Sequence, residues 1–264
     1  MKNQDIDTHP CSSRRMLAMG LLLLFIFHPY NLFASDNFSW FGLWRDGIDN
    51  PQTEDGYRMA RTEMVEEQIR SYGITNAAVI KAMLEVPRHI FVPEEQRSQA
   101  YGDHPLPIGY GQTISQPLIV AYRCDMAKIS PDDRVLEVGT GSGYHAAVMS
   151  RLAKVIYSME IVPELAERSQ KALAGLGYDN IETRYGDGYY GWPEKGPFQV
   201  IMVTAAAGQI PPPLLEQLAE GGRMLIPVGQ PFLVQNLVIA EKRNGKIYSR
   251  TLIPVRFVPL MEDR

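Results

Sequence analysis

One stretch of the sequence reads Leu136-Glu137-Val138-Gly139-Thr140-Gly141-Ser142-Gly143-Tyr144. It places three glycines directly after an apolar strand and directly before a helix. Glycine adopts dihedrals that are closed to other residues and lets the backbone come close to a ligand. The dinucleotide fingerprint is G-x-G-x-x-G, whereas the spacing here is G-x-G-x-G. The stretch therefore predicts a site for a nucleotide-like cofactor that a dinucleotide would fit poorly.

Acidic residues follow the next two predicted strands. Glu160 ends the second strand, where a carboxylate can accept hydrogen bonds from both ribose hydroxyls. Asp187 ends the third strand, where it can accept from an adenine amino group, although Gly186-Asp187-Gly188 is equally typical of a turn. Ligands of open parallel sheets bind at the carboxyl ends of the strands. Three such features on consecutive strand ends therefore favour a single cofactor site.

Strands and helices alternate around the glycine-rich stretch. Apolar strands are expected over 134–138, 155–159, 181–185, 198–203 and 224–228, separated by helices near 144–152, 163–176 and 213–219. Such alternation predicts an α/β fold with a mostly parallel sheet and helices on both faces. Asn244-Gly245 is a type I′ turn signal between two further strands. We therefore expect the sheet to end in a C-terminal antiparallel hairpin.

The region before the sheet is predicted to contain two helices and a long loop. The first helix ends at Gly73, and the second runs from about Asn76 to Val86. Residues 87–117 carry so many prolines and glycines that they predict an extended loop, a kind of segment that is often functional. The next helix is expected to begin at Pro117 and to end near residue 128, with Ser115 or Gln116 as its N-terminal cap. A helix start can bind an anion, although an ordinary cap explains Ser115 equally well.

Composition excludes several classes of protein. The chain has 264 residues, 45% hydrophobic and 21% charged, with a net charge of −4. This is ordinary globular composition, without the basic surplus of a nucleic-acid-binding protein. The two cysteines, Cys11 and Cys124, and the five histidines show no metal-ligand spacing. We expect neither a metal site nor a nucleic-acid partner.

Residues 1–34 are predicted to be a signal-like or membrane-targeting segment. Arg14 and Arg15 precede an apolar run from Met16 to Phe27, and Leu32-Phe33-Ala34 offers a cleavage site. The run is short for a membrane span, which needs roughly 20 apolar residues. An uncleaved tether and an upstream start codon are the alternatives. We interpret residues 35–56 as a linker and residues 57–264 as the catalytic domain.

Together these residues resemble the protein-L-isoaspartate O-methyltransferases over nearly all of Ala60 to Leu260. The most specific matching pieces are the glycine-rich stretch and residues 86–93, 106–117, 203–206 and 255–260. The resemblance implies a class I S-adenosylmethionine-dependent methyltransferase, Rossmann-like, whose strand order at the hairpin end differs from that of other class I enzymes. It implies S-adenosyl-L-methionine as the cofactor and proteins that carry L-isoaspartyl residues as partners.

The resemblance also implies residue roles. It places Ser115 at the active site and the stretch around Arg256 and Val258 over the substrate. With the strand-end residues described above, the expected cofactor contacts are Thr113, Ile114, Gly139, Thr140, Gly141, Gly143, Glu160, Asp187 and Gly188.

The implied reaction moves a sulfonium methyl group to the free α-carboxylate of an isoaspartyl residue. The ester then collapses to a succinimide that can reopen to normal aspartate, which begins repair. Because model carboxyl groups have a pKa of about 4, the acceptor is already ionised near neutral pH. Positioning carries most of the catalysis. We therefore expect Ser115 to orient the acceptor, without acting as a general base.

Several alternatives stay open at the level of sequence. A small-molecule methyltransferase would methylate only free metabolites, and a non-catalytic cofactor-binding protein would bind the donor without consuming it. An NAD-dependent dehydrogenase is disfavoured by the glycine spacing. The family works in the cytoplasm, where the donor is made, so we expect a cytoplasmic protein. We also expect a monomer. A periplasmic protein, or one tethered to a membrane through residues 14–34, is the alternative.

Overall fold

The structure is a computed structural model that describes residues 53–262. The predicted targeting segment, residues 1–34, lies outside the described residues, as does nearly all of the predicted linker. No helix between residues 53 and 262 is both long enough and apolar enough to cross a membrane.

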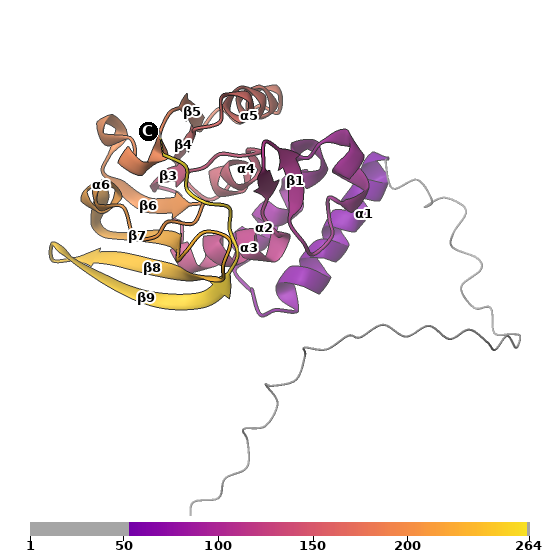
Figure 1. Ribbon diagram of the computed structural model, residues 1–264. Coiled ribbons are helices and arrows are strands. Elements are labelled where there is room, and N and C mark those ends of the chain that lie inside the picture. The colour runs from indigo at the N-terminus through magenta and orange to yellow at the C-terminus, as the bar shows by residue number, and fades with distance from the viewer. Residues whose placement is uncertain (1–52, 263–264) are drawn as a thin grey trace, which may run out of the picture. The chain divides into compact units, whose positions relative to one another are not determined.

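A seven-stranded sheet forms the centre of the fold, in the order β5-β4-β3-β6-β7-β8-β9. The first five strands of this order run parallel, and β8 and β9 are antiparallel additions at one edge (Figure 1). The predicted α/β fold with a C-terminal hairpin is thus confirmed. The bounds of the strands are β3 (Arg134–Val138), β4 (Val155–Glu160), β5 (Ile181–Tyr185), β6 (Phe198–Val203), β7 (Leu218–Val228), β8 (Gln235–Arg243) and β9 (Lys246–Val255).

The hairpin turn has the backbone that its sequence predicts. Asn244 and Gly245 have φ angles of 51° and 72°, and a type I′ turn requires positive φ at both central residues. Lys246 opposite Arg243 then sets the register of β9 on β8.

Helices cover the two faces of the sheet unequally. Successive strand residues point to opposite faces, so Val135 packs into one apolar cluster and Leu136 into another. The cluster around Val135 includes side chains of three helices, α3 (Pro117–Ala127), α4 (Tyr144–Ser150) and α5 (Pro163–Gly175). The cluster around Leu136 is covered by the short helix α6 (Pro212–Glu216) and neighbouring 3-10 turns.

The N-terminal part of the described chain is helical. Helix α1 (Glu54–Glu63) continues into a π-helical segment, Met64–Arg70, and is followed by α2 (Ala77–Glu85). The side chain of Asn76 accepts hydrogen bonds from the first turn of α2, as expected of a cap. Helix α1 starts before Tyr57, where we expected the domain to begin, because Thr53 caps it and two acidic residues fill its first turn.

The prediction of an extended loop over residues 87–117 is wrong in part. The segment holds 3-10 turns at Arg88–Phe91 and Glu94–Gln99, then a small antiparallel pair formed by β1 (Leu106–Gly109) and β2 (Gln112–Ile114). Each of these strands is only three or four residues long, too short to show a period among so many prolines and glycines. The pair extends to the residue directly before Ser115.

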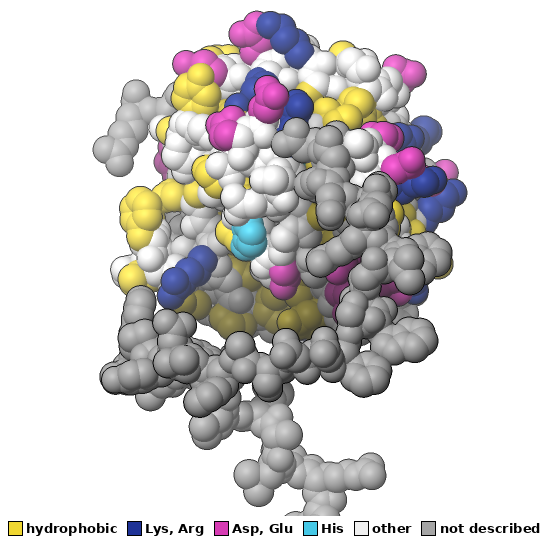
Figure 2. All heavy atoms as spheres, turned by 90° about the vertical axis from the view of Figure 1, so that its right-hand side faces the viewer, with side chains coloured by type: hydrophobic (Ala, Val, Ile, Leu, Met, Phe, Trp, Pro, Cys, Tyr) yellow, Lys and Arg dark blue, Asp and Glu magenta, His cyan; other side chains and the backbone are white. Residues whose placement is uncertain are grey.

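Charged side chains on the outer surface are mixed by sign. On the part of the face that Figure 2 leaves visible, basic and acidic side chains lie among each other and do not gather into a patch of one sign. Ion pairs between Arg58 and Asp55 and between Arg70 and Glu66 show the same mixture on the first helical segments. Such exposed pairs contribute little to stability.

Candidate active site

The glycine loop between β3 and α4 has the positive φ angles that only glycine adopts easily. Gly139, Gly141 and Gly143 have φ angles of 96°, 55° and 89°. A Cβ atom on Gly139 would lie 2.2 Å from the Oγ1 of Thr204, which follows β6. The loop therefore passes directly against the end of the neighbouring strand, and any side chain at residue 139 would separate the two.

The first backbone amides of the glycine loop already have hydrogen-bond partners within the protein. The amides of Gly139 and Thr140 both donate to the carbonyl of Met159, at 2.8 and 3.0 Å. The amide of Gly141 donates to the Oε2 of Glu160 at 2.7 Å. The glycines therefore serve mainly to shape the loop and bring it close, and they leave few amides to bind an anion.

Glu160 ends β4 and is almost fully buried, with 6% of its surface exposed. Besides the bond from Gly141, its Oε1 accepts from the amides of Ile161 and Val162, each at 3.0 Å. A carboxylate has about four acceptor positions, so these three bonds fix its orientation and leave one free. Glu160 also lines the pocket described next.

A pocket lies at the carboxyl ends of the parallel strands, where the sequence predicts a cofactor. The space between its walls is about 760 Å³ when the solvent at its open mouth is included. Its walls come from β2, the glycine loop, the ends of β4 and β6, and the C-terminal stretch. Of the predicted cofactor contacts, those that line it are Thr113, Ile114, Gly139, Thr140, Gly141, Glu160 and Gly188.

The other two predicted cofactor contacts, Gly143 and Asp187, lie outside the lining of this pocket. A Cβ on Gly143 would meet Leu173 at 3.3 Å, so this glycine permits close packing of the loop on α5. The Oδ1 of Asp187 accepts from the amide of Tyr189 at 2.8 Å and caps a 3-10 turn. The adjoining Gly188 reaches the pocket, so Asp187 lies directly beside it in the chain.

A second pocket adjoins the first and contains the predicted substrate residues. Arg256 and Val258 both line it, and it shares Thr113, Ser115, Thr204 and Val258 with the cofactor pocket. Ser115 lines both pockets. The resemblance implies that this residue lies at the active site. Within residues 53–262, no protein group forms a hydrogen bond with the Ser115 side chain. Gln116 is the cap residue of α3, although its side chain bonds Asp103 instead of the helix.

Thr204 is a residue of both pockets that sequence reasoning missed. Its Oγ1 lies 2.9 Å from the carbonyl oxygen of Val138 and 2.6 Å from that of Gly139, so it binds β6 to the glycine loop. Its position directly after β6 could have marked it as a site residue, because ligands of parallel sheets bind at the carboxyl ends of the strands. The C-terminal residues Pro259, Leu260 and Met261 also line the cofactor pocket. Pro259 and Leu260 belong to the matching piece 255–260, but their apolar side chains gave no reason to assign them a role.

Beneath the glycine loop lies a buried polar group centred on Glu137. Its Oε2 accepts from Ser158 at 2.5 Å, and the hydroxyls of Ser158 and Thr140 lie 2.6 Å apart. Burial raises the pKa of Glu137 to about 8. The Nδ1 of His145 is 3.8 Å from Glu137, but burial lowers the pKa of His145 well below its usual value. The imidazole is therefore neutral, and this contact is not an ion pair.

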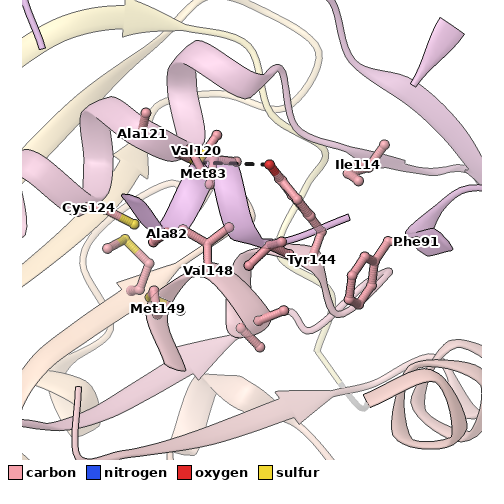
Figure 3. Packing of buried hydrophobic residues seen from close by; sticks show 14 of the residues in the cluster. Ala82, Met83, Phe91, Ile114, Val120, Ala121, Cys124, Tyr144, Val148 and Met149 are labelled. Carbon is pink, nitrogen blue, oxygen red and sulfur yellow. Dashed lines mark hydrogen bonds between the residues drawn. The ribbon is translucent and has the colours of Figure 1, made fainter. Parts of the chain in front are cut away.

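Tyr144 directly follows the loop and anchors α4 in the core. It is fully buried, lines the cofactor pocket and points its hydroxyl to the sulfur of Met83, at 3.8 Å (Figure 3). Phe91 meets its ring edge-on, with centroids 5.8 Å apart. Cys124, in the same cluster, is buried, and burial raises the pKa of its thiol to about 12, so the thiol is protonated and unreactive. Among the described residues, no group of three acidic, histidine or cysteine side chains is placed to hold a metal.

Strand order, glycine loop and strand-end carboxylate together define a class I S-adenosylmethionine-dependent methyltransferase. Residues 59–264 match the family model of the protein-L-isoaspartate(D-aspartate) O-methyltransferases. The chain belongs to this family. It is therefore an enzyme that uses S-adenosyl-L-methionine to methylate isoaspartyl residues, and the recognition made from the sequence is confirmed.

Individual relatives agree with this assignment. The chain is 52% identical over 213 residues to protein-L-isoaspartate O-methyltransferase 1 of Nitrosospira multiformis, a match that covers 80% of this chain and 90% of the relative. It is 54% identical over 212 residues to the protein-L-isoaspartate O-methyltransferase of Opitutus terrae, covering 79% and 91%.

Solved structures show the same fold. A protein-L-isoaspartate O-methyltransferase superposes with a TM-score of 0.69 at 31% identity, covering 75% of this chain and 65% of that one. A Plasmodium falciparum structure named for the same activity, in complex with S-adenosyl-L-homocysteine, gives a TM-score of 0.68 at 28% identity, covering 77% and 99%.

Proposed function

We propose that Ser115 and the two pockets around it carry out methyl transfer to the α-carboxylate of L-isoaspartyl residues. The observation that supports this most directly is that Ser115 lines both pockets and that its hydroxyl has no partner within residues 53–262. A hydroxyl that lies between donor and acceptor sites and is not used by the protein is free to bond the substrate.

In this proposal the first pocket holds the donor, which supplies a methyl group on a cationic sulfur. Glu160 accepts one hydrogen bond from the ribose at its free acceptor position, and its three backbone bonds hold it in place for that role. Thr113, Ile114 and the glycine loop form the surrounding wall, with Gly188 on the side of the base. Gly143 and Asp187 support this wall from behind, through helix packing and a capped turn.

The second pocket holds the acceptor. Ser115 donates to one oxygen of the carboxylate and turns the other oxygen toward the donor pocket. No general base is needed because the carboxylate is ionised at neutral pH. Arg256, exposed at the rim, attracts the negative charge, and Val258 covers the site where the pockets meet. Correct orientation of reacting groups can account for a large part of a rate enhancement.

The test is a methyl-transfer assay with two peptides that differ only in one linkage. One peptide contains L-isoaspartate and its twin contains normal aspartate at the same position. We expect labelled methyl groups to appear only on the isoaspartyl peptide. Equal transfer to both peptides, or transfer only to free metabolites, would contradict the proposal. Donor binding without any transfer would indicate the non-catalytic alternative.

We further propose that the chain acts as a cytoplasmic monomer. The donor is made in the cytoplasm, which supports this location. Fractionation of native cells, sequencing of the mature N-terminus and sedimentation of the purified protein test these points. A mature chain that begins at Ser35 in a periplasmic fraction would instead favour the export alternative.

A further inference from the structure

The connection between β7 and β8 presents three consecutive apolar side chains to solvent. Phe232, Leu233 and Val234 are 87%, 58% and 55% exposed. Phe232 also has a φ of 64°, a conformation that costs a bulky residue about 1–2 kcal/mol. Strained backbone of this kind is concentrated at sites that bind ligands. The exposed run adds nothing to the core, so its apolar character needs another reason.

Gln235 fixes this connection beside the acceptor pocket. Its side chain is buried, with 1% exposed, and its Oε1 accepts from the amide of Phe257 at 2.8 Å. Its Nε2 donates to the carbonyl oxygens of Gln230 and Phe257, at 3.3 and 3.5 Å. One buried amide therefore bonds both the connection and the stretch that covers the substrate. As a result, Val234 forms part of the wall of the acceptor pocket.

The acceptor pocket has a polar end and an apolar end. Ser115, Thr113 and Thr204 form the end that faces the cofactor pocket. The remaining wall is largely aliphatic and aromatic, with side chains such as Val234 and Phe257, and Arg256 is the one charged residue among those that line it. An isoaspartyl carboxylate occupies only the polar end. The apolar end is thus open to whatever lies next to that residue in the substrate.

We infer that the segment Phe232–Val234 binds an apolar side chain adjacent to the isoaspartyl residue of the substrate polypeptide. This inference rests on the proposed function, since it assigns the neighbour of the methylated residue. The segment reaches the acceptor pocket at Val234, which lines it, and this favours the substrate over a second copy of the chain as the occupant. Apolar side chains are mostly buried in folded proteins. The segment therefore favours isoaspartyl sites in unfolded chains, where such neighbours are accessible.

The experiment compares two short peptides with L-isoaspartate at the centre, flanked by leucine in one and by serine in the other. Burial of a leucine side chain gains enough free energy to favour the leucine peptide roughly tenfold in kcat/KM, mainly through KM. The double variant Phe232→Ser, Leu233→Ser should bring this ratio close to one. Tyr248→Ser is the matched control, because Tyr248 is 54% exposed on β9 and lines neither pocket. It should keep the wild-type ratio.

Each outcome has a distinct meaning. Equal rates on both peptides with the wild type, or an unchanged ratio in the double variant, would overturn the inference and leave the proposed function intact. Failure of the wild type to methylate either peptide would instead overturn the proposed function. A concentration-dependent dimer that the double variant abolishes, with the ratio unchanged, would assign the surface to self-association. Should the double variant not fold, Leu233→Ser alone gives the same readout.

Discussion

The Oε2 of Glu160 accepts a hydrogen bond from the backbone amide of Gly141, with 2.7 Å between the two atoms. This bond joins the end of β4 to the loop after β3, so one carboxylate both shapes the loop and lines the pocket proposed for the donor. Glu160→Gln replaces an acceptor oxygen by an NH2 group among backbone donors. Hydrogen bonds to charged groups contribute about 1.5–3 kcal/mol, so affinity for S-adenosyl-L-homocysteine should fall ~10–100-fold in calorimetric titration.

A matched control for this change is Glu164→Gln, which removes an exposed carboxylate from the first turn of α5. It should leave donor affinity unchanged within about twofold, since its effect is limited to the helix dipole. If the two variants bind the donor product equally well, Glu160 does not hold the ribose.

Ser115→Ala tests orientation of the acceptor. Loss of one hydrogen bond to a carboxylate should lower kcat/KM for an isoaspartyl peptide ~10–100-fold. Calorimetry should show that affinity for S-adenosyl-L-homocysteine is retained, because the donor pocket keeps its other walls. Ser98→Ala, at an exposed serine that lines neither pocket, is the control. Wild-type turnover in the Ser115 variant would remove this residue from the mechanism.

Gly139→Ala tests how closely the glycine loop passes β6. The new Cβ would meet the Oγ1 of Thr204 at 2.2 Å and would also adopt a φ of 96°. Gly177→Ala has a similar backbone cost, with a φ of 70°, but no atom lies within 4 Å of its Cβ. Chemical denaturation should therefore show about 1 kcal/mol lost for Gly177→Ala and ~1–3 kcal/mol more for Gly139→Ala. Equal losses would mean that Thr204 moves away without cost.

Glu137 should make stability depend on pH. Burial raises its pKa from 4.5 to about 8, so the native state holds a proton that the unfolded state has released. Stability from this group is present at low pH and is lost as pH rises from about 4.5 to 8, by up to about 1.4 kcal/mol per pH unit.

The variant Glu137→Gln isolates this effect because it keeps an oxygen for Ser158 and cannot titrate. His89 and His145, whose pKa values burial lowers, change stability in the opposite direction, but they are present in both proteins. Urea titrations at several pH values give the free energy of unfolding of each protein. The wild-type value minus the variant value should fall as the pH rises to about 8 and then level off. A flat difference would show that Glu137 is ionised in the native state.

Sequence predicts the fold well where its pattern is long. Strands such as Phe198–Val203 are continuous apolar runs, and the helix from Pro163 begins with proline, so both were located closely. The β1–β2 pair was missed because its buried residues, Leu106, Ile108 and Ile114, are separated by prolines, glycines and a turn. Strands of three or four residues show too little alternation of apolar and polar side chains to be recognised.

Local sequence pattern also marks some residues of the candidate site and leaves others unmarked. Glu160 and Ser115 carry polar groups at a strand end and a helix start, and the structure brings both to one pocket. Thr204 and Gln235 were not assigned, because their roles depend on which strands become neighbours. The loop amides donate hydrogen bonds to Met159 and Glu160 because β3 pairs with β4, and no local sequence pattern reveals that pairing.

The C-terminal stretch has a practical consequence for anyone who handles this protein. Leu260 and Met261 line the cofactor pocket, and the stretch is pinned to the sheet where Ala206 exchanges two backbone bonds with Val258 and Leu260. An affinity tag or fusion partner added after Arg264 would follow Met261, a residue that lines this pocket, by only a few residues in the chain. A purification handle is therefore better placed directly before α1, whose residues line neither pocket.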